Sequence, residues 1–227
     1  MRKIPVYFMP GLAASPDIFE RIVLPEDQFD IHFLEWTLPE PGETLSDYAK
    51  RMCIHVTDAN AVLIGVSFGG VLVQEMAQFV NPSKVIIISS IKCNLQFPLR
   101  MRLTKFTKLY KIFPTHLASD FSRFEKLPFG SKFRQRLKLY EKFLAIRDKI
   151  YLDWALEQII LWKRSVPDEN VIHIHGDADE VFPAKYITTD FIPVKGGTHI
   201  MILNKYKWLN ENLPKIILGQ DHSGPNS

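Results

Sequence analysis

The sequence predicts an α/β domain: a doubly wound, mostly parallel sheet of about six strands that carries a helical insertion. Three observations predict it. Short apolar runs alternate with segments of helical periodicity, and several runs are apolar without a break, as in strands covered on both faces. Residues 92–165 also differ from the rest in charge and aromatic content. A chain of 227 residues can bury one large core, so we expect one domain with an insertion.

Composition excludes several other classes. With 16 Phe, 7 Tyr, 4 Trp and only 11 Gly, the chain is neither disordered nor collagen-like. It contains no run of 18 apolar residues, and a short apolar run ending at Pro10 follows the first three residues directly, so we expect no membrane span and no signal peptide. Cys53 and Cys93 lack metal-ligand spacing, which argues against a structural zinc site or a disulfide scaffold. The expected setting is the reduced cytoplasm.

Six apolar runs predict the strands. They cover residues 4–9, 31–36, 61–66, 85–88, 171–174 and 191–194. Helical patterns predict helices over residues 44–56, over residues 68–79, and over residues 200–218 with an interruption at Pro214. Because these strands and helices alternate, we expect βαβ units with right-handed crossovers.

The insertion, residues 92–165, is basic and aromatic. It holds 17 Lys and Arg against 6 Asp and Glu, while the rest of the chain holds 11 against 19, and it carries 13 of the 27 aromatic residues. Periodicity predicts three or four amphipathic helices with breaks at Pro98, Pro114 and residues 128–130. The predicted division is a core of residues 1–91 and 166–219, the insertion, and a polar tail of residues 220–227.

A G-x-S-x-G pentapeptide, residues 65–69, follows the third predicted strand and precedes a helix. A strand-to-helix turn this tight needs small neighbours and exposes its central hydroxyl above the sheet, so Ser67 is a candidate nucleophile. The alternative is an ordinary glycine-rich turn. A serine hydroxyl needs a base that is itself oriented by an acid. After later strands come Asp177 and Asp179, and then His199 behind a Gly-Gly pair.

In these motifs the chain resembles the α/β-hydrolase family over nearly all of its length. In that family the acid lies in a pattern similar to G-x-x-D-x-x-x-P, which Gly176, Asp179 and Pro183 match. The resemblance implies Ser67 as nucleophile, His199 as base and Asp179 as acid, with Asp177 fitting only if the loop shifts by two residues. His173 and His175 are spaced as a possible metal pair, but no third ligand is evident.

The resemblance also implies an oxyanion hole made of two backbone N–H groups. Phe68, directly after Ser67, supplies one, and Leu12, in the loop after the first strand, supplies the other. Pro10 stands where the family usually has a histidine. An antiparallel pair of N-terminal strands that many members have is not predicted here. The insertion corresponds to the cap that members carry over the active site.

The expected function is that of a serine hydrolase acting on an ester or related acyl bond of a small, partly apolar molecule, without a cofactor or metal. Carbon–carbon bond cleavage or a lyase reaction on the same triad is the alternative, and a non-catalytic receptor is a third. The insertion could present a solvated basic face, line an acyl pocket with its aromatic residues, or contact an anionic membrane surface. No nucleic-acid motif accompanies its charge. Neither the substrate nor the oligomeric state is indicated by the sequence.

Overall fold

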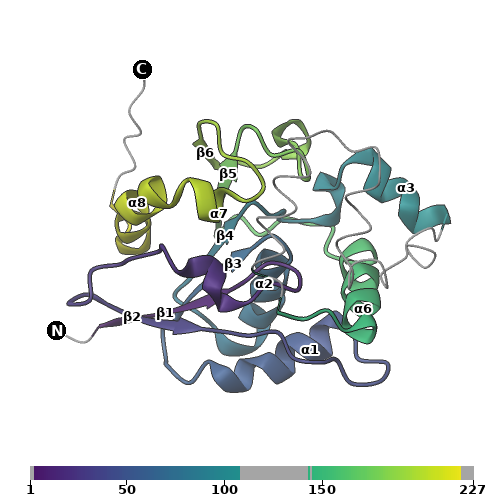
Figure 1. Cartoon of the computed structure of the whole chain (residues 1–227), viewed down its shortest axis with the longest axis horizontal. Helices are drawn as coiled ribbons and strands as arrows, with labels where there is room; N and C mark the ends of the chain where they lie inside the picture. The colour runs from purple at the N-terminus through teal and green to yellow at the C-terminus, as the bar shows by residue number, and fades with distance from the viewer. Residues whose placement is uncertain (1–2, 108–142, 144, 221–227) are drawn as a thin grey trace.

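Six parallel strands form the centre of the structure, a computed structural model that describes residues 3–107, 143 and 145–220 (Figure 1). The strands lie in the order β2-β1-β3-β4-β5-β6. Their bounds are β1 Ile4–Met9, β2 Phe29–Phe33, β3 Val62–Val66, β4 Lys84–Ile88, β5 Val171–Gly176 and β6 Ile192–Val194. Every strand pairs in parallel with its neighbours, so all carboxyl ends meet at one edge of the sheet. The predicted fold class and strand number are confirmed.

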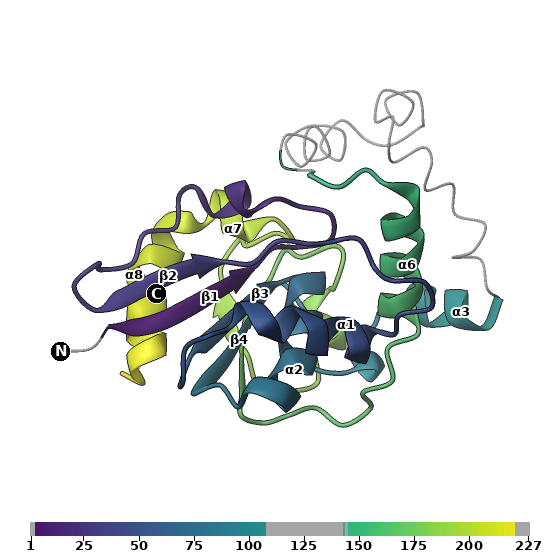
Figure 2. The same cartoon turned by 90° about the horizontal axis from the view of Figure 1, so that it is seen from below.

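Helices cover both faces of this sheet, because alternate side chains of each strand point to opposite sides. On β1, Tyr7 and Met9 join a core with α1 (Leu45–Met52) and α2 (Phe68–Val80). Val6 and Phe8 join the opposite core with α7 (Met201–Asn204) and α8 (Tyr206–Leu218). Figure 2 shows α7 and α8 on one side of the strands and α1 and α2 on the other. The result is a three-layer, doubly wound arrangement.

The second strand lies earlier than the apolar run 31–36 predicts. β2 spans Phe29–Phe33 and is an edge strand of the sheet. It pairs with β1 alone, from Phe29 opposite Ile4 to Phe33 opposite Phe8. An edge strand tolerates polar residues such as the exposed Asp30, so a search for apolar runs starts this strand too late. Trp36 has already left the sheet, and its indole bonds to the loop after β1.

The predicted interruption of the last helix at Pro214 is wrong. The break lies at Lys205, which has a φ of −118° between α7 and α8. α8 continues through Pro214 and ends at Leu218, before Gly219 with a φ of 72°. Proline removes one backbone hydrogen bond, but Leu213, Ile216 and Ile217 around it are buried against the sheet, and this packing keeps the final turns in place.

Two α-helices of the insertion lie in the described part of the chain. α3 (Leu99–Thr107) begins directly after Pro98, as predicted, and α6 (Lys149–Ile160) begins with the Asp148 carboxylate accepting from the backbone N–H of Ile150 and Tyr151. α6 packs into the core that also holds α1 and α2. The predicted breaks at Pro114 and residues 128–130, most of the helical pattern near residues 137–144, and tail residues 221–227 lie outside the described residues. Within the described part, no helix combines the length and apolar character needed to cross a bilayer.

Candidate active site

Ser67 lies at the sharp turn between β3 and α2. Its φ of 52° and ψ of −119° fall where a residue with a Cβ is rarely found, a conformation that costs about 1–3 kcal/mol. Its surroundings hold this backbone: the Ser67 N–H donates to the Ile88 carbonyl at 2.9 Å, and the Ser90 hydroxyl donates to the Ser67 carbonyl at 2.7 Å. The tight strand-to-helix turn that the sequence predicts at Ser67 is therefore present.

Close backbone approach explains the glycines around Ser67. A Cβ on Gly65 would lie 2.3 Å from the Gly69 carbonyl oxygen, which no side chain could tolerate. A Cβ on Gly69 would lie 2.3 Å from the Pro10 carbonyl oxygen. The second contact shows that the first turn of α2 lies directly against the loop that follows β1.

Three side chains from the carboxyl ends of different strands meet beside this turn. The distance from Ser67 Oγ to His199 Nε2 is 2.9 Å, and that from His199 Nδ1 to Asp179 Oδ2 is also 2.9 Å. A carboxylate only accepts, so His199 Nδ1–H donates to Asp179 and Nε2 accepts from the Ser67 hydroxyl. Asp179 is fully buried, whereas the His199 side chain is 21% exposed. The three residues expected to act together are hydrogen-bonded in series.

The loop after β5 fixes the carboxylate of Asp179. Its Oδ1 accepts from the backbone N–H of Val181 at 2.8 Å and of Phe182 at 2.9 Å, which leaves Oδ2 for His199. Burial by itself raises the pKa of this carboxyl, but the charge and hydrogen bond of His199 and the Phe182 N–H together hold the pKa below its usual value. Asp179 is therefore a carboxylate that can stabilise a protonated imidazole.

Asp177 has a different place from Asp179. Its Oδ1 accepts from the Gly196 N–H at 2.7 Å and so connects the loop after β5 to the loop after β6. The two loops also touch through their backbones, since a Cβ on Gly176 would lie 2.1 Å from the Gly197 carbonyl oxygen. Asp177 braces these loops, while Asp179 bonds to His199.

The two predicted oxyanion donors lie on neighbouring segments. Phe68 is the first residue of α2, whose N-terminus carries partial positive charge, and its ring is fully buried. Leu12 belongs to the loop after β1, which touches the first turn of α2 through Pro10 and Gly69. Both N–H groups thus come from segments that flank Ser67.

His173 and His175 form a buried pair behind the loop after β5, which is called the acid loop below because it carries the proposed acid Asp179. His175 Nε2 donates to the Phe182 carbonyl at 2.8 Å, and its Nδ1 lies 3.1 Å from His173 Nε2. Burial lowers the pKa of both imidazoles, that of His173 well below its usual value. Among residues 3–107, 143 and 145–220, no group of three or more His, Cys, Asp or Glu side chains lies close enough to hold a metal ion.

A cavity of only about 10 Å³ adjoins Ser67 and His199, and its other walls are mostly apolar. These walls are Gly11, Ile18, Val66, Ile200, Ile202 and Leu203. The space accommodates at most about one water molecule, so this side of the nucleophile cannot hold a substrate.

Two separate parts of the insertion contact the loops beside Ser67. At its start, the Arg100 guanidinium donates to the Glu180 carbonyl at 2.8 Å, and Phe97 packs on Phe182, with ring centroids 6.1 Å apart. Further along the insertion, the Phe143 carbonyl accepts from the Ser15 N–H at 2.7 Å. The insertion thus contacts the acid loop on one side and the loop after β1 on the other.

Several solved structures share the fold of this chain. A thermophilic esterase from Thermogutta terrifontis aligns with a TM-score of 0.68 and 14% identity, over 95% of this chain and 90% of that chain. An enol-lactonase from Burkholderia xenovorans LB400 aligns with a TM-score of 0.68 and 12% identity, over 96% and 92%. The chain has the α/β-hydrolase fold.

A third structure with this α/β-hydrolase fold is a bromoperoxidase from Bacillus anthracis, with a TM-score of 0.63 and 17% identity over 96% of this chain and 92% of that chain. No protein-family model matches the sequence, and no curated protein matches it. At such low identity the likeness concerns the fold, and the chemistry has to be argued from the site itself.

Several residues around the site were not singled out by sequence reasoning. The Val181 and Phe182 N–H groups that hold Asp179 are backbone atoms, so no residue type signals them. Trp36 and Tyr151 bond to the loop after β1 from distant parts of the chain. His175 did give a signal, because it directly precedes the G-x-x-D pattern, but its bond to the Phe182 carbonyl depends on how that loop folds back.

Proposed function

We propose that the protein is a serine hydrolase that cleaves a carboxylic ester or related acyl bond of a small, partly apolar substrate. The observation that carries the proposal is the hydrogen-bonded series from Asp179 through His199 to Ser67, with 2.9 Å at both links. The names of two solved structures with the same fold, an esterase and an enol-lactonase, agree with this class of reaction.

In the proposed reaction, the Ser67 oxygen attacks the acyl carbon while His199 Nε2 takes its proton. The carbonyl oxygen becomes an oxyanion, which the N–H groups of Leu12 and Phe68 stabilise. His199 then protonates the leaving alcohol, and the ester of Ser67 remains. Water attacks this ester, His199 accepts the water proton and returns it to Ser67, and the acid is released. Asp179 orients the imidazole and stabilises its charged form.

The insertion, residues 92–165, acts as a cap in this proposal. The cavity behind Ser67 is too small for a substrate, so the acyl and alcohol groups need space on the other side of the nucleophile. The contacts of Arg100 with the acid loop and of Phe143 with the loop after β1 support a cap that spans these two loops. The basic charge of the insertion favours anionic substrates or surfaces, and a cytoplasmic setting remains the prediction from cysteine usage.

Hydrolysis of p-nitrophenyl acetate and butyrate tests the proposal. Wild-type protein should release p-nitrophenol with saturation kinetics, and Ser67→Ala should reduce kcat to near the background rate. Ser83→Ala is the matched control, because that hydroxyl bonds to the Asn60 carbonyl at the opposite edge of the sheet. Equal rates for wild type and Ser67→Ala would refute the assignment. Inertness to all esters, together with turnover of a β-diketone, would favour carbon–carbon cleavage on the same triad.

A further inference from the structure

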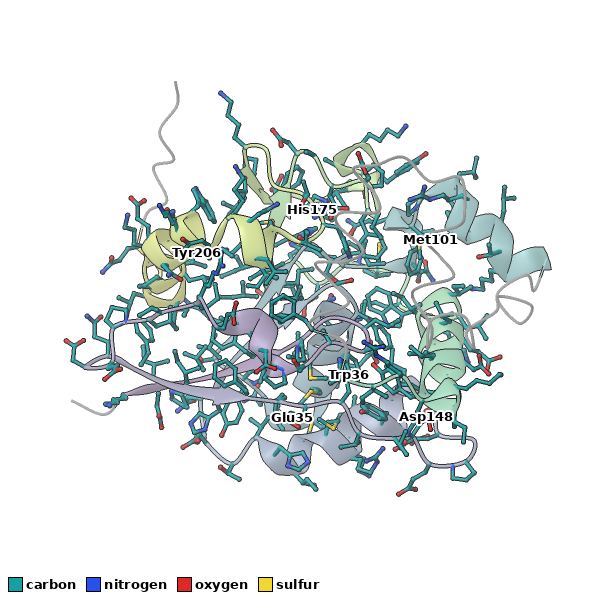
Figure 3. All side chains as sticks on the ribbon, viewed as in Figure 1. Glu35, Trp36, Met101, Asp148, His175 and Tyr206 are labelled. Atoms are coloured by element: carbon teal, nitrogen blue, oxygen red, sulfur yellow. The ribbon has the colours of Figure 1, made fainter. Side chains whose placement is uncertain are left out.

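Two buried aromatic side chains hold the loop after β1, and we propose that Trp36 and Tyr151 are positioning residues for the oxyanion donor of Leu12. The inference rests on the proposed function, because it assigns how the same site is held. Trp36 follows β2, and Tyr151 lies in α6, so neither belongs to the loop that it contacts. Trp36 is buried, and Figure 3 shows it well apart from His175 of β5.

Trp36 fixes the peptide group between Gly11 and Leu12. Its indole Nε1–H donates to the Gly11 carbonyl at 2.7 Å, and this bond is buried. The peptide bond is trans, so the Gly11 C=O and the Leu12 N–H point in opposite directions. Holding the carbonyl toward Trp36 therefore directs the Leu12 N–H away from it. Gly11 also forms part of the wall of the cavity beside Ser67.

Tyr151 fixes the next peptide group, between Leu12 and Ala13. The Ala13 N–H donates to the Tyr151 hydroxyl at 3.1 Å in a buried bond. The Ala14 N–H donates to the Gly11 carbonyl at 3.1 Å, and Ala13 has a φ of 60°, the pattern of a type II turn that prefers glycine at this position. The tyrosine hydroxyl thus stabilises a turn that an alanine alone disfavours. Both peptide groups of Leu12 are held by one aromatic side chain each.

The same aromatic cluster also reaches the second donor. The rings of Trp36 and Phe68 stack with centroids 5.0 Å apart and planes 6° apart, and the Tyr151 ring lies 5.7 Å from Trp36. The backbone of the insertion also holds the loop after β1, because the Ala145 N–H donates to the Ala13 carbonyl at 2.9 Å. One side of the proposed oxyanion hole is thus built partly by the insertion, so the insertion contributes to the catalytic geometry as well as covering the site.

The variants Trp36→Phe and Tyr151→Phe test the proposal, since each keeps an aromatic ring and removes the hydrogen-bonding group. Trp36→Phe also removes part of the ring system, a loss of volume that the control Trp154→Phe reproduces. Loss of a direct donor costs about 10²- to 10³-fold in kcat, so loss of its support should cost less, about 10-fold for p-nitrophenyl butyrate. KM should change by less than about 2-fold, because the oxyanion forms only after the substrate is bound.

An inhibition constant distinguishes a loss of oxyanion positioning from a loss of folded enzyme. An alkyl trifluoromethyl ketone accepts the Ser67 oxygen at its carbonyl carbon, His199 takes the proton, and the resulting hemiketal carries an oxyanion. Its inhibition constant should weaken by about the same 10-fold factor as kcat in both variants. The ratio of this constant to KM is independent of the fraction of folded enzyme.

The controls are Trp154→Phe and Tyr48→Phe, which lie in the same buried cluster. They remove a bond from Trp154 Nε1 to the Glu43 carbonyl at 2.7 Å and one from the Tyr48 hydroxyl to the Thr37 carbonyl at 3.0 Å, both away from the loop after β1. Their kcat should stay within about 2-fold of wild type. The positioning proposal is overturned if kcat falls equally in all four variants, or if it does not fall in Trp36→Phe and Tyr151→Phe, provided that Ser67→Ala is inactive. An active Ser67→Ala instead refutes the proposed function.

Discussion

The two sides of Ser67 are held by different kinds of contact. On the acid and base side, Asp179 is fixed by the N–H groups of residues two and three positions further along its own loop. On the side of the proposed oxyanion donors, called the oxyanion side below, the loop after β1 is held by Trp36 and Tyr151, whose contacts span 25 and 138 residues of sequence. The side of Asp179 is thus held by local contacts, whereas the oxyanion side depends on distant elements and on the insertion.

This difference separates what each side does for the proposed chemistry. The acid and base side needs one proton path, and short loops after neighbouring strands provide it. The oxyanion side needs backbone N–H groups aimed at a charge that exists only during reaction, and it couples that aim to α6. Changes at the acid and base side should therefore abolish turnover, and changes at the oxyanion side should reduce it in steps.

Replacing the base should have the largest effect. In His199→Ala, Ser67 loses its proton acceptor, and kcat for p-nitrophenyl butyrate should fall by about 10⁶-fold or to background. Steady-state kinetics measure this, with the exposed His55→Ala as the matched control. Substantial turnover in His199→Ala would show that His199 is not the base.

Replacing the proposed acid, Asp179, should have the second largest effect on kcat. Asp179→Asn keeps the shape but favours the wrong imidazole tautomer, so kcat should fall by about 10⁴-fold. Asp177→Asn, the neighbouring control, should change kcat by only about 2- to 5-fold, because Asp177 bonds to the Gly196 N–H and not to His199. A larger loss in Asp177→Asn than in Asp179→Asn would reverse the assignment of the acid.

The residues on the acid and base side of Ser67 could be predicted from the sequence because each lies in a short local motif. Ser67, Asp179 and His199 each follow an apolar strand within a short motif that includes glycine, and the parallel sheet brings such strand ends together. Trp36 could not be assigned in the same way: the predicted strand, residues 31–36, includes it, whereas pairing with β1 ends β2 at Phe33. Only tertiary packing brings its indole to Gly11.

The last helix and the insertion illustrate the same limit. Pro214 is a local signal for a break, but burial of Ile216 and Ile217 overrides it. Helical periodicity found α6, yet it could not show that the Tyr151 hydroxyl would reach Ala13. Local patterns therefore predicted the strands, most helix positions and the three residues that the structure brings into hydrogen-bond contact, whereas the contacts of Trp36 and Tyr151 with the loop after β1 are seen only in the structure.

Deleting an oxyanion donor tests the other side directly. Proline has no N–H, and the second position of a type II turn accepts it, so Leu12→Pro should remove the donor while keeping the turn. The kcat should fall by about 10²- to 10³-fold. Leu12→Ala retains the N–H and should remain within about 3-fold of wild type. Similar kcat values for the two variants would show that Leu12 N–H is not a donor.

The histidine pair behind the acid loop predicts a pH effect on stability. Burial holds the pKa of His173 well below its usual value, so below about pH 6.5 the unfolded chain binds a proton that the folded chain does not. From pH 7 to pH 5 this should remove about 2 kcal/mol of unfolding free energy, and His173→Gln should weaken the dependence by that amount. Urea unfolding at both pH values measures it, with the exposed His55→Gln as control. An unchanged pH dependence in His173→Gln would contradict the assignment.

Labelling by a fluorophosphonate, which reacts with an activated serine and loses fluoride, tests most directly whether Ser67 is the nucleophile. We expect one label per chain, located on Ser67 by peptide mass spectrometry, and labelling at least about 10³-fold slower in His199→Ala. Trp36→Phe and Tyr151→Phe should still label, more slowly than wild type. No label on folded wild-type protein, or a label on a serine other than Ser67, would contradict the account.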